Sequence, residues 1–367
     1  MKVQGKHYRT IWAATNNSAV CIIDQTRLPH EFVSVELNTA AEMAHAIQSM
    51  QVRGAPLIGV AAAYGMYLAA QENSQESNLR DAYEILLATR PTAINLRWGL
   101  DRTLNTILQF PPEKRAEIAL KTAKAIADED VVINQGIAQH ALKIIHAHWQ
   151  KKQRPIHILT HCNAGWLATV DWGTALSGVY AAHEAGIPVH VWVDETRPRN
   201  QGASLTAWEL QAQDIPHTLI VDNLAGLLMQ QQKVDLCIVG TDRATASGHI
   251  CNKVGTYLKA LAAFDNHIPF YAAAPSPSFD WKIYEMTEIP IEARDSEEVL
   301  MIHGRDKTGQ FRTISIAPEN TNALNYAFDI TPRKYLTGII TERGCSHAHE
   351  NSLKELFPEY YPLFVEN

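Results

Sequence analysis

The chain has 367 residues, which predicts about two domains, since a domain usually contains roughly 100 to 200 residues. Hydrophobic residues make up 46% of the sequence and charged residues 19%, a balance typical of a globular protein in water. A formal net charge of −7 offers no basic surface for nucleic acid, and no apolar run approaches the roughly 20 residues of a membrane span. The amino terminus lacks the apolar core of a signal peptide, and the five cysteines form no CxxC pair. We therefore expect a cytoplasmic protein with reduced thiols and no metal site.

The first 150 residues predict a small sheet followed by helices. Between residues 8 and 37, two apolar stretches separated by RLPH are typical of an antiparallel β pair. Asn38 or Thr39 can cap a helix through MAHAIQSM, and RGAP at 53–56 opens an alanine-rich helix. Helical patterns continue through DAYEILLAT, NLRWGLDRTLNTIL and a long stretch from about Pro112, while QENSQESN predicts a surface loop. We expect an N-terminal helical domain with a small antiparallel sheet over residues 1–150.

From residue 151 the pattern changes to strand, turn and helix in repetition. The strand-like runs are IHILTHC, VHVWVDE, HTLIVDN, LCIVGTD and PFYAAAP, and the helix-like runs between and after them include TALSGVYAAHEAG, LTAWELQAQD, LAGLLMQQQ and NKVGTYLKALAAFDN. Such alternation indicates βαβ units and a parallel sheet covered on both faces. We therefore expect a Rossmann-like α/β domain over residues 151–367. No GxGxxG follows its first strand, so no dinucleotide cofactor is expected.

Cys162 and Asp242 follow two of these predicted strands directly. Because ligands of open parallel sheets bind outside the carboxyl ends of the strands, a thiol and a carboxylate there are candidates for acid–base chemistry. Taken alone, a cysteine is more often a small buried apolar residue. For Asp194 and Asp222, at two other strand ends, we favour helix capping, and for His161, beside the cysteine, a packing role.

Three segments can bind an anion. RGAP places Arg53 and free backbone N–H groups at a helix start, where the helix dipole favours negative charge. RPTAINL supplies Arg90, and NKVGTY is expected to open a further helix with Lys253. Each segment alone is weak evidence, since basic side chains are usually solvated, but together they suit a phosphate group.

Six motifs follow one another along the chain: RGAPLIGVAAAYG, RPTAINL, HCNAGWLATVDWGTAL, DETRPRNQGASLTAWEL, VGTDRATASGHICNKVGTY and FDITPRKYLTGIITERG. In order and spacing they resemble the methylthioribose-1-phosphate isomerases of the methionine salvage pathway, from about residue 8 to residue 345. Six ordered motifs are far more specific than any single one. The resemblance implies the two-domain α/β fold described above, an aldose–ketose isomerase without a cofactor, a sugar-phosphate substrate and a homodimer.

The resemblance also implies roles for individual residues. Cys162 and Asp242 would be the catalytic pair, with Asp242 as general acid and Cys162 as the base in its thiolate form. The substrate contacts would fall on Arg53, Gly54, Ala55, Arg90 and Gln201, with Asn252 and Lys253 closing the site. The acid role requires a raised pKa for Asp242, and neighbouring arginine would favour the thiolate of Cys162.

Two motifs depart from the family pattern. QGASLTAWEL has Ser204 where QGARLTAWEL has arginine, and SGHICNK, with Ser247, His249 and Cys251, stands in place of NGDVANK. These departures leave open an isomerase of a related pentose 1-phosphate, such as 5-deoxyribose 1-phosphate or ribose 1,5-bisphosphate. A different class also shares the fold, namely the regulatory subunits of the translation initiation guanine-nucleotide exchange factor, which bind and do not catalyse. The presence of both Cys162 and Asp242 favours the enzyme over this alternative.

Overall fold

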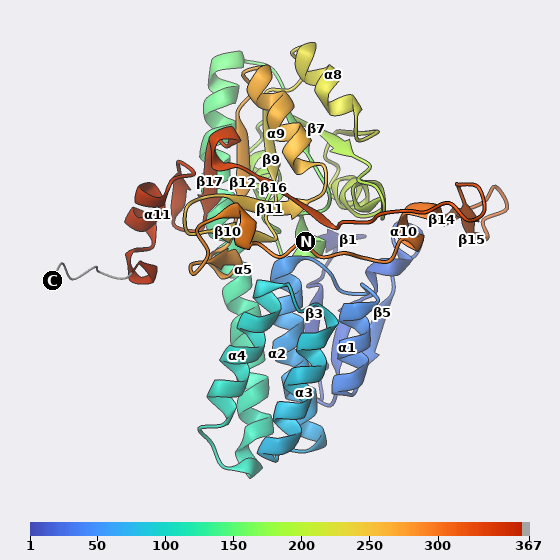
Figure 1. Ribbon diagram of the computed structural model, residues 1–367, viewed down its shortest axis with the longest axis vertical. Coiled ribbons are helices and arrows are strands. Elements are labelled where there is room, and N and C mark those ends of the chain that lie inside the picture. Colours follow the sequence, from blue (N-terminus) through green and yellow to red (C-terminus); the bar gives the residue numbers. More distant parts are fainter. Residues whose placement is uncertain (362–367) are drawn as a thin grey trace.

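A computed structural model describes residues 1–361, and Figure 1 shows the arrangement of its elements. A bundle of helices occupies the lower part of the view, and an α/β layer structure lies above it. Between residues 1 and 361, no helix is both long and apolar enough to cross a bilayer. The α/β fold expected from the sequence is confirmed.

The N-terminal part begins with short strands and continues with helices. Its elements are β1 Lys2–Val3, β2 Lys6–His7, β3 Ile11–Ala13, β4 Val20–Ile23, β5 Ser34–Leu37, α1 Ala40–Gln48, α2 Ala55–Glu72, α3 Glu76–Thr89, α4 Ile94–Ile107 and α5 Pro112–Lys152. The expected antiparallel pair is a three-stranded sheet, because β3 pairs with the free edge of β4. Thr39 caps α1 in a capping box with Glu42. The predicted loop QENSQESN is shorter than expected, since only residues 73–75 separate α2 from α3.

Helix α5 is 41 residues long and belongs to two cores. Ala119, Ala123 and Ile126 pack with α2 and α4 in the core of the helical bundle. Ile137 and Ile145 pack instead under the parallel sheet. A single helix therefore connects the bundle to the sheet, and it runs along both in Figure 1.

The C-terminal part is built around a seven-stranded sheet of order β18-β17-β12-β9-β6-β7-β8. Its strands are β6 Ile156–Thr160, β7 Val189–Asp194, β8 His217–Ile220, β9 Leu236–Val239, β12 Phe270–Ala273, β17 Gly338–Thr341 and β18 Gly344–Ser346. All neighbours are parallel except β17 and β18. The helices of this part are α6 Ser177–Glu184, α7 Ala207–Ala212, α8 Leu224–Gln230, α9 Thr256–Asp265, α10 Glu297–Leu300 and α11 Glu350–Leu356. The five strands expected from the sequence are confirmed, and β17 and β18 extend the sheet beyond them.

A second sheet corrects one prediction. It has the order β13-β10-β11-β16, with β10 Arg243–Thr245, β11 Ile250–Lys253, β13 Phe279–Asp280 and β16 Phe328–Thr331. Asn252 and Lys253 lie in β11, so the expected helix start at NKVGTY is wrong and α9 begins at Thr256. The residues before that helix pair with β10 and β16, and Gly255, at φ +103°, separates strand from helix.

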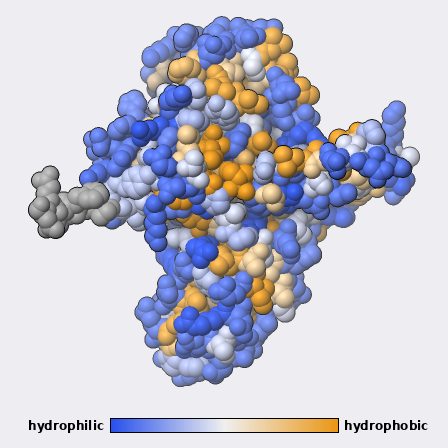
Figure 2. Space-filling view, viewed as in Figure 1, coloured by the Kyte–Doolittle hydropathy of each residue, from blue (hydrophilic) through white to orange (hydrophobic). Residues whose placement is uncertain are grey.

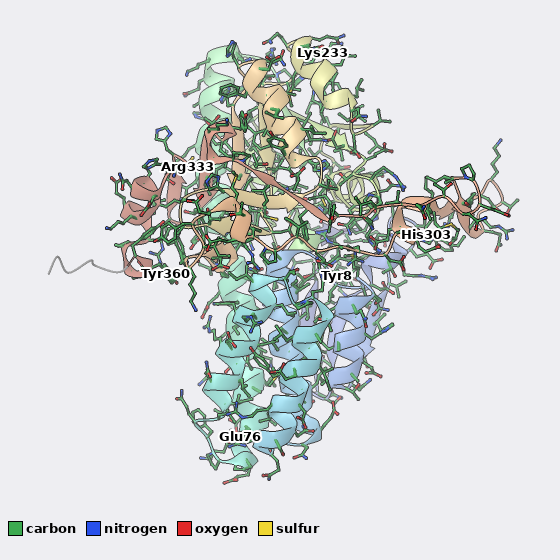
Figure 3. All side chains as sticks on the ribbon, viewed as in Figure 1. Tyr8, Glu76, Lys233, His303, Arg333 and Tyr360 are labelled. Carbon is green, nitrogen blue, oxygen red and sulfur yellow. The ribbon has the colours of Figure 1, made fainter. Side chains whose placement is uncertain are left out.

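A long hairpin protrudes from the molecule. Its strands are β14 Met301–Arg305 and β15 Phe311–Ser315, and Figure 3 shows His303 on this hairpin, away from the main body.

Some apolar side chains of the helices are exposed, among them Leu227 on α8 and Phe264 on α9. Figure 2 shows apolar surface over this region.

Candidate active site

The strand order of the main sheet reverses between β6 and β9. The chain proceeds from β6 through β7 to β8 in one direction, and then from β9 to β12 and β17 in the other. Such a reversal leaves a crevice outside the carboxyl ends of the two central strands. Cys162 follows β6 and Asp242 follows β9, so the fold brings both to this crevice.

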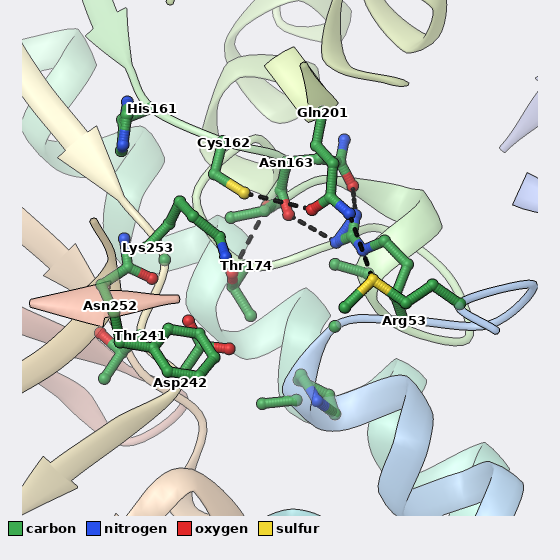
Figure 4. Close-up of a pocket in the computed structure, with 18 of the residues that line it drawn as sticks. Arg53, His161, Cys162, Asn163, Thr174, Gln201, Thr241, Asp242, Asn252 and Lys253 are labelled. Atoms are coloured by element: carbon green, nitrogen blue, oxygen red, sulfur yellow. Dashed lines mark hydrogen bonds between the residues drawn. The ribbon is translucent and has the colours of Figure 1, made fainter. Parts of the chain in front are cut away.

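Cys162 is held in a tight turn by its backbone. It adopts φ +63°, its N–H donates to Oγ1 of Thr196 (2.8 Å), and its carbonyl accepts from the hydroxyl of Thr206 (2.7 Å). Its thiol donates to Oε1 of Gln201 (3.4 Å). The left-handed backbone conformation is costly for a residue with a side chain, so these contacts fix the direction of the thiol. Figure 4 shows the sulfur directed into the pocket beside Gln201.

Asp242 lies across the pocket, where the main sheet passes into the smaller one. Its N–H donates to the carbonyl of Cys251 on β11 (2.9 Å). With the Asn252 amide oriented to satisfy its neighbours, Nδ2 donates to Oδ2 of Asp242 (3.1 Å) and Oδ1 accepts from Thr256 (3.0 Å). The carboxyl group is therefore anchored on one side and faces the pocket on the other.

Three cationic side chains surround this pair. The Arg53 guanidinium is buried and donates to the side chain and to the carbonyl (2.7 Å) of Asn163. Arg90 pairs with Glu292 (2.6 Å), and its buried Nε has no partner in the described part of the chain. The Lys253 ammonium lies 4.8 Å from the ring centre of Phe328. Positive charge thus reaches the pocket from three separate elements.

The N-terminus of α2 forms the floor of the site. Gly54 precedes it at φ +93°, and a Cβ there would lie 2.6 Å from the Cα of Ala168. Only glycine allows this approach, which places the backbone N–H groups of Gly54 and Ala55, at the start of an 18-residue helix, in the lining of the pocket. An anion at this position would be stabilised by those groups and by the helix dipole.

One pocket contains every site residue that the sequence predicted. Its lining includes Arg53, Gly54, Ala55, Arg90, Cys162, Gln201, Asp242, Asn252 and Lys253. Figure 4 shows Cys162, Gln201 and Arg53 on one side of it, with Asp242, Asn252 and Lys253 on the other. Residues as far as 200 positions apart in the chain, Arg53 and Lys253, thus meet in a single site.

Burial governs the protonation of the catalytic pair. It raises the pKa of Asp242, although Lys253, Arg90 and Arg53 act in the opposite direction. It also raises the pKa of Cys162, which Lys253 and Arg53 lower and Asp242 raises further. A raised Asp242 pKa agrees with the expected acid. Arg53 favours the thiolate of Cys162 as expected, but desolvation exceeds the attraction of the cations and the net shift of the pKa is upward.

Sequence reasoning missed the support behind Arg53. Nδ2 of Asn163 donates to Oε1 of Glu209 (2.9 Å), and the Glu209 carboxylate also accepts from the N–H groups of Trp166 (2.7 Å) and Leu167 (2.8 Å). Glu209 is buried, and its charge balances that of Arg53. Nothing in the run LTAWEL distinguishes Glu209 from an exposed helical glutamate. Asn163, in contrast, is adjacent to Cys162 in the sequence, and this proximity is a signal that could have identified it.

Asp194 and Asp222 do not cap helices as expected. Asp222 accepts from the N–H groups of Thr196 and Arg197 (2.8 Å each). Asp194 is fully buried and contacts the Lys259 ammonium (2.9 Å). Both carboxylates therefore support the loop behind Cys162.

A larger cavity adjoins the pocket. The pocket itself encloses about 50 Å³, whereas the neighbouring cavity encloses about 450 Å³ and shares Met50, Arg53 and Gln201 with it. Ser204 lines this outer cavity and is absent from the pocket lining, and its hydroxyl donates to the carbonyl of Asn200 (2.9 Å). The departure from the family motif at Ser204 thus lies in the outer cavity and not in the lining of the pocket that contains Cys162 and Asp242.

Comparison with known proteins places the chain in a family. Residues 51–348 match the Initiation factor 2 subunit family. A methylthioribose-1-phosphate isomerase of Rhodospirillum rubrum is 55% identical over 100% of this chain and 95% of its own length, and one of Paramagnetospirillum magneticum is 55% identical over 98% and 99%.

Solved structures agree with this placement. A 5-methylthioribose 1-phosphate isomerase from Pyrococcus horikoshii OT3 superposes with a TM-score of 0.82 at 41% identity, covering 96% of this chain and 97% of its own. The structure described as translation initiation factor eIF-2B, subunit delta, from A. fulgidus gives 0.79 at 38% identity, covering 96% and 100%. The chain belongs to the Initiation factor 2 subunit family and, within it, to the methylthioribose-1-phosphate isomerases.

Proposed function

We propose that the protein converts 5-methylthioribose 1-phosphate into 5-methylthioribulose 1-phosphate, with Asp242 as general acid and Cys162 as base. The observation that carries this proposal is the meeting of both residues at the reversal of strand order, inside a ring of three cations. Relatives at 55% identity over the whole chain bear the name of this isomerase. We further propose that it acts in the cytoplasm as a homodimer, with a domain boundary near residue 150.

The phosphate is bound at the N-terminus of α2. Gly54 and Ala55 offer backbone N–H groups, and Arg53, Arg90 and Lys253 offer charge. Arg90 lines the pocket and is held there by its ion pair with Glu292. Binding of the phosphate at this position also orients C1 and C2 of the sugar relative to Asp242 and Cys162.

The isomerisation requires the furanose ring to open and hydrogen to move from C2 to C1. The bond between C1 and the ring oxygen breaks, and Asp242 protonates that oxygen. In a cis-enediol route Cys162 takes the proton from C2 and returns it to C1, while the 2-hydroxyl proton passes to the Asp242 carboxylate. In a hydride-shift route the hydrogen moves directly from C2 to C1, and Cys162 takes the 2-hydroxyl proton and returns it to Asp242. Both routes end with the carbonyl at C2 and the phosphate unchanged, and both use the same acid and base.

The electrostatics of the pair suit these roles. The negative charge of Asp242 raises the pKa of Cys162, so protonation of Asp242 removes this obstacle to the thiolate. Arg53 and Lys253 stabilise the thiolate in turn. The reactive form therefore has the proton on the carboxyl group and the charge on sulfur, which is the form that ring opening needs.

Phosphorus and proton NMR of the purified protein tests the proposal. Incubation with 5-methylthioribose 1-phosphate should give the ketose signals rapidly, with 5-deoxyribose 1-phosphate and ribose 1,5-bisphosphate as parallel substrates. Turnover of one of the parallel substrates alone would identify a related isomerase. No turnover of any of the three would favour a regulatory subunit that binds without catalysis.

A further inference from the structure

We infer that His161 is a positioning residue, which holds the strand end carrying Lys253 against the turn carrying Cys162. The inference rests on the proposed function, since it assigns His161 a part in building that site. His161 lies directly before Cys162, is 1% exposed, and takes no part in the proposed chemistry. Its contacts show what it does instead.

Both ring nitrogens of His161 are engaged. Nε2 donates to the carbonyl of Val254 (2.8 Å), because a carbonyl oxygen can only accept. Nδ1 lies 3.1 Å from Oδ2 of Asp194, whose side chain is completely buried. Neither nitrogen is therefore free to exchange a proton with a substrate, which distinguishes a positioning role from a catalytic one.

The contact with Val254 joins the two sheets of the site. His161 follows β6 of the seven-stranded sheet, whereas Val254 follows the end of β11 in the four-stranded sheet. Val254 is bonded to Lys253, so the position of that carbonyl sets the direction of the lysine backbone. At Gly255 a Cβ would lie 3.1 Å from the His161 ring, which shows that this segment packs directly on the imidazole.

Asp194 anchors the other side of the same link. Its carboxylate contacts His161 and the Lys259 ammonium (2.9 Å), while its carbonyl accepts from the Thr196 hydroxyl (3.0 Å). That hydroxyl oxygen in turn accepts from the N–H of Cys162 (2.8 Å). Asp194 thus positions Cys162 through its own backbone carbonyl and the Thr196 hydroxyl, and it positions Lys253 through its carboxylate and His161.

A metal ion is a less suitable explanation for this cluster. Ligand atoms of His161, Asp194 and Asp222 lie within 4.8 Å of one another. The Lys259 ammonium already contacts Asp194 and donates to the carbonyl of Asp222 (3.3 Å). Positive charge at this position is therefore supplied by the protein itself.

Two amide variants distinguish the contributions of the two ring nitrogens of His161. His161→Gln keeps a donor near the position of Nε2 and should retain the link to Val254. His161→Asn keeps a donor near Nδ1 and loses that link. We expect kcat/KM for 5-methylthioribose 1-phosphate to fall by about tenfold or more in the Asn variant and by less than about threefold in the Gln variant, since tenfold corresponds to roughly one hydrogen bond. His157→Asn, on strand β6 just before His161 but outside the pocket lining, is the matched control and should be unchanged.

A double-mutant cycle links the effect to Lys253. If His161 acts by placing this lysine, removing His161 should matter little once Lys253 is gone. Substrate affinity measured by calorimetry should therefore differ by less than about twofold between Lys253→Gln and the double variant His161→Asn/Lys253→Gln. Multiplying effects would overturn the inference, as would equal losses in the Asn and Gln variants. Absence of turnover in the unmodified protein would instead overturn the proposed function, so the two failures are distinguishable.

Discussion

The thiol of Cys162 donates to Oε1 of Gln201 across 3.4 Å, so the proposed base and a proposed substrate ligand are hydrogen-bonded to each other. Replacing this acceptor by a carboxylate would repel the phosphate and oppose formation of the thiolate. We expect Gln201→Glu to lower kcat/KM by about 100-fold or more and Gln201→Ala by about tenfold, in line with lost charge-assisted contacts. Steady-state kinetics of both variants measure this, and a Glu variant as active as the parent would contradict the role of Gln201.

The coupling between Cys162 and Asp242 predicts a shift in thiol reactivity. The ionised Asp242 carboxylate raises the pKa of Cys162, so Asp242→Asn should lower it, and alkylation should begin at lower pH. We expect the midpoint to move to lower pH, because a nearby like charge is removed. Mass spectrometry of the Cys162 peptide after iodoacetamide treatment at a series of pH values measures this shift. The exposed Cys345 serves as the internal control, and an unchanged midpoint at Cys162 would refute the coupling.

The close approach at Gly54 predicts that an alanine at this position lowers the unfolding free energy by more than backbone strain alone would. Gly54 and Gly186 both have positive φ, but a Cβ at Gly186 would meet nothing within 4 Å. Gly186→Ala should therefore cost about 1 to 2 kcal/mol of unfolding free energy, the cost of the left-handed conformation. Gly54→Ala should cost clearly more, because the backbone of Ala168 must move as well. Denaturant unfolding of the two variants compares these costs, and equal losses would show that the approach to Ala168 is unimportant.

The variant Ser204→Arg, which restores the arginine of the family motif, tests whether this departure changes the substrate preference. Because Ser204 lines the outer cavity and not the catalytic pocket, Ser204→Arg should alter entry of substrate more than its discrimination. We expect the ratio of kcat/KM for 5-methylthioribose 1-phosphate to that for 5-deoxyribose 1-phosphate to change by less than about threefold, well under the discrimination of a direct contact. Inversion of this ratio would place Ser204 in contact with the substrate.

Much of this architecture was predictable from local sequence patterns. Alternating strand and helix signals predict the parallel sheet, and the position of Cys162 and Asp242 at strand ends marks both residues without reference to any family. Thr39 was predictable as a cap because capping depends on a few neighbouring residues. These features have in common that short-range chemistry determines them.

Other features depend on partners far away in the chain. Lys253 lies in a strand because β11 pairs with β10 and β16, and the residues of β16 are about 75 positions further along. The raised pKa of Cys162 depends on how deeply the closed fold buries it. The roles of Glu209 and Asp194 likewise appear only once α7 contacts the turn after β6 and β7 contacts α9. In each case tertiary contacts override the local conformational preference, so the feature could not be predicted from the neighbouring sequence.

The most direct test of the account is the turnover of 5-methylthioribose 1-phosphate by Cys162→Ala and Asp242→Asn, measured beside the unmodified protein. We predict that each variant loses about 10²- to 10⁴-fold in kcat, the usual contribution of a general acid or base, while its thermal unfolding midpoint stays close to that of the parent. Full activity in either variant would contradict the assignment of Cys162 and Asp242 as the catalytic pair.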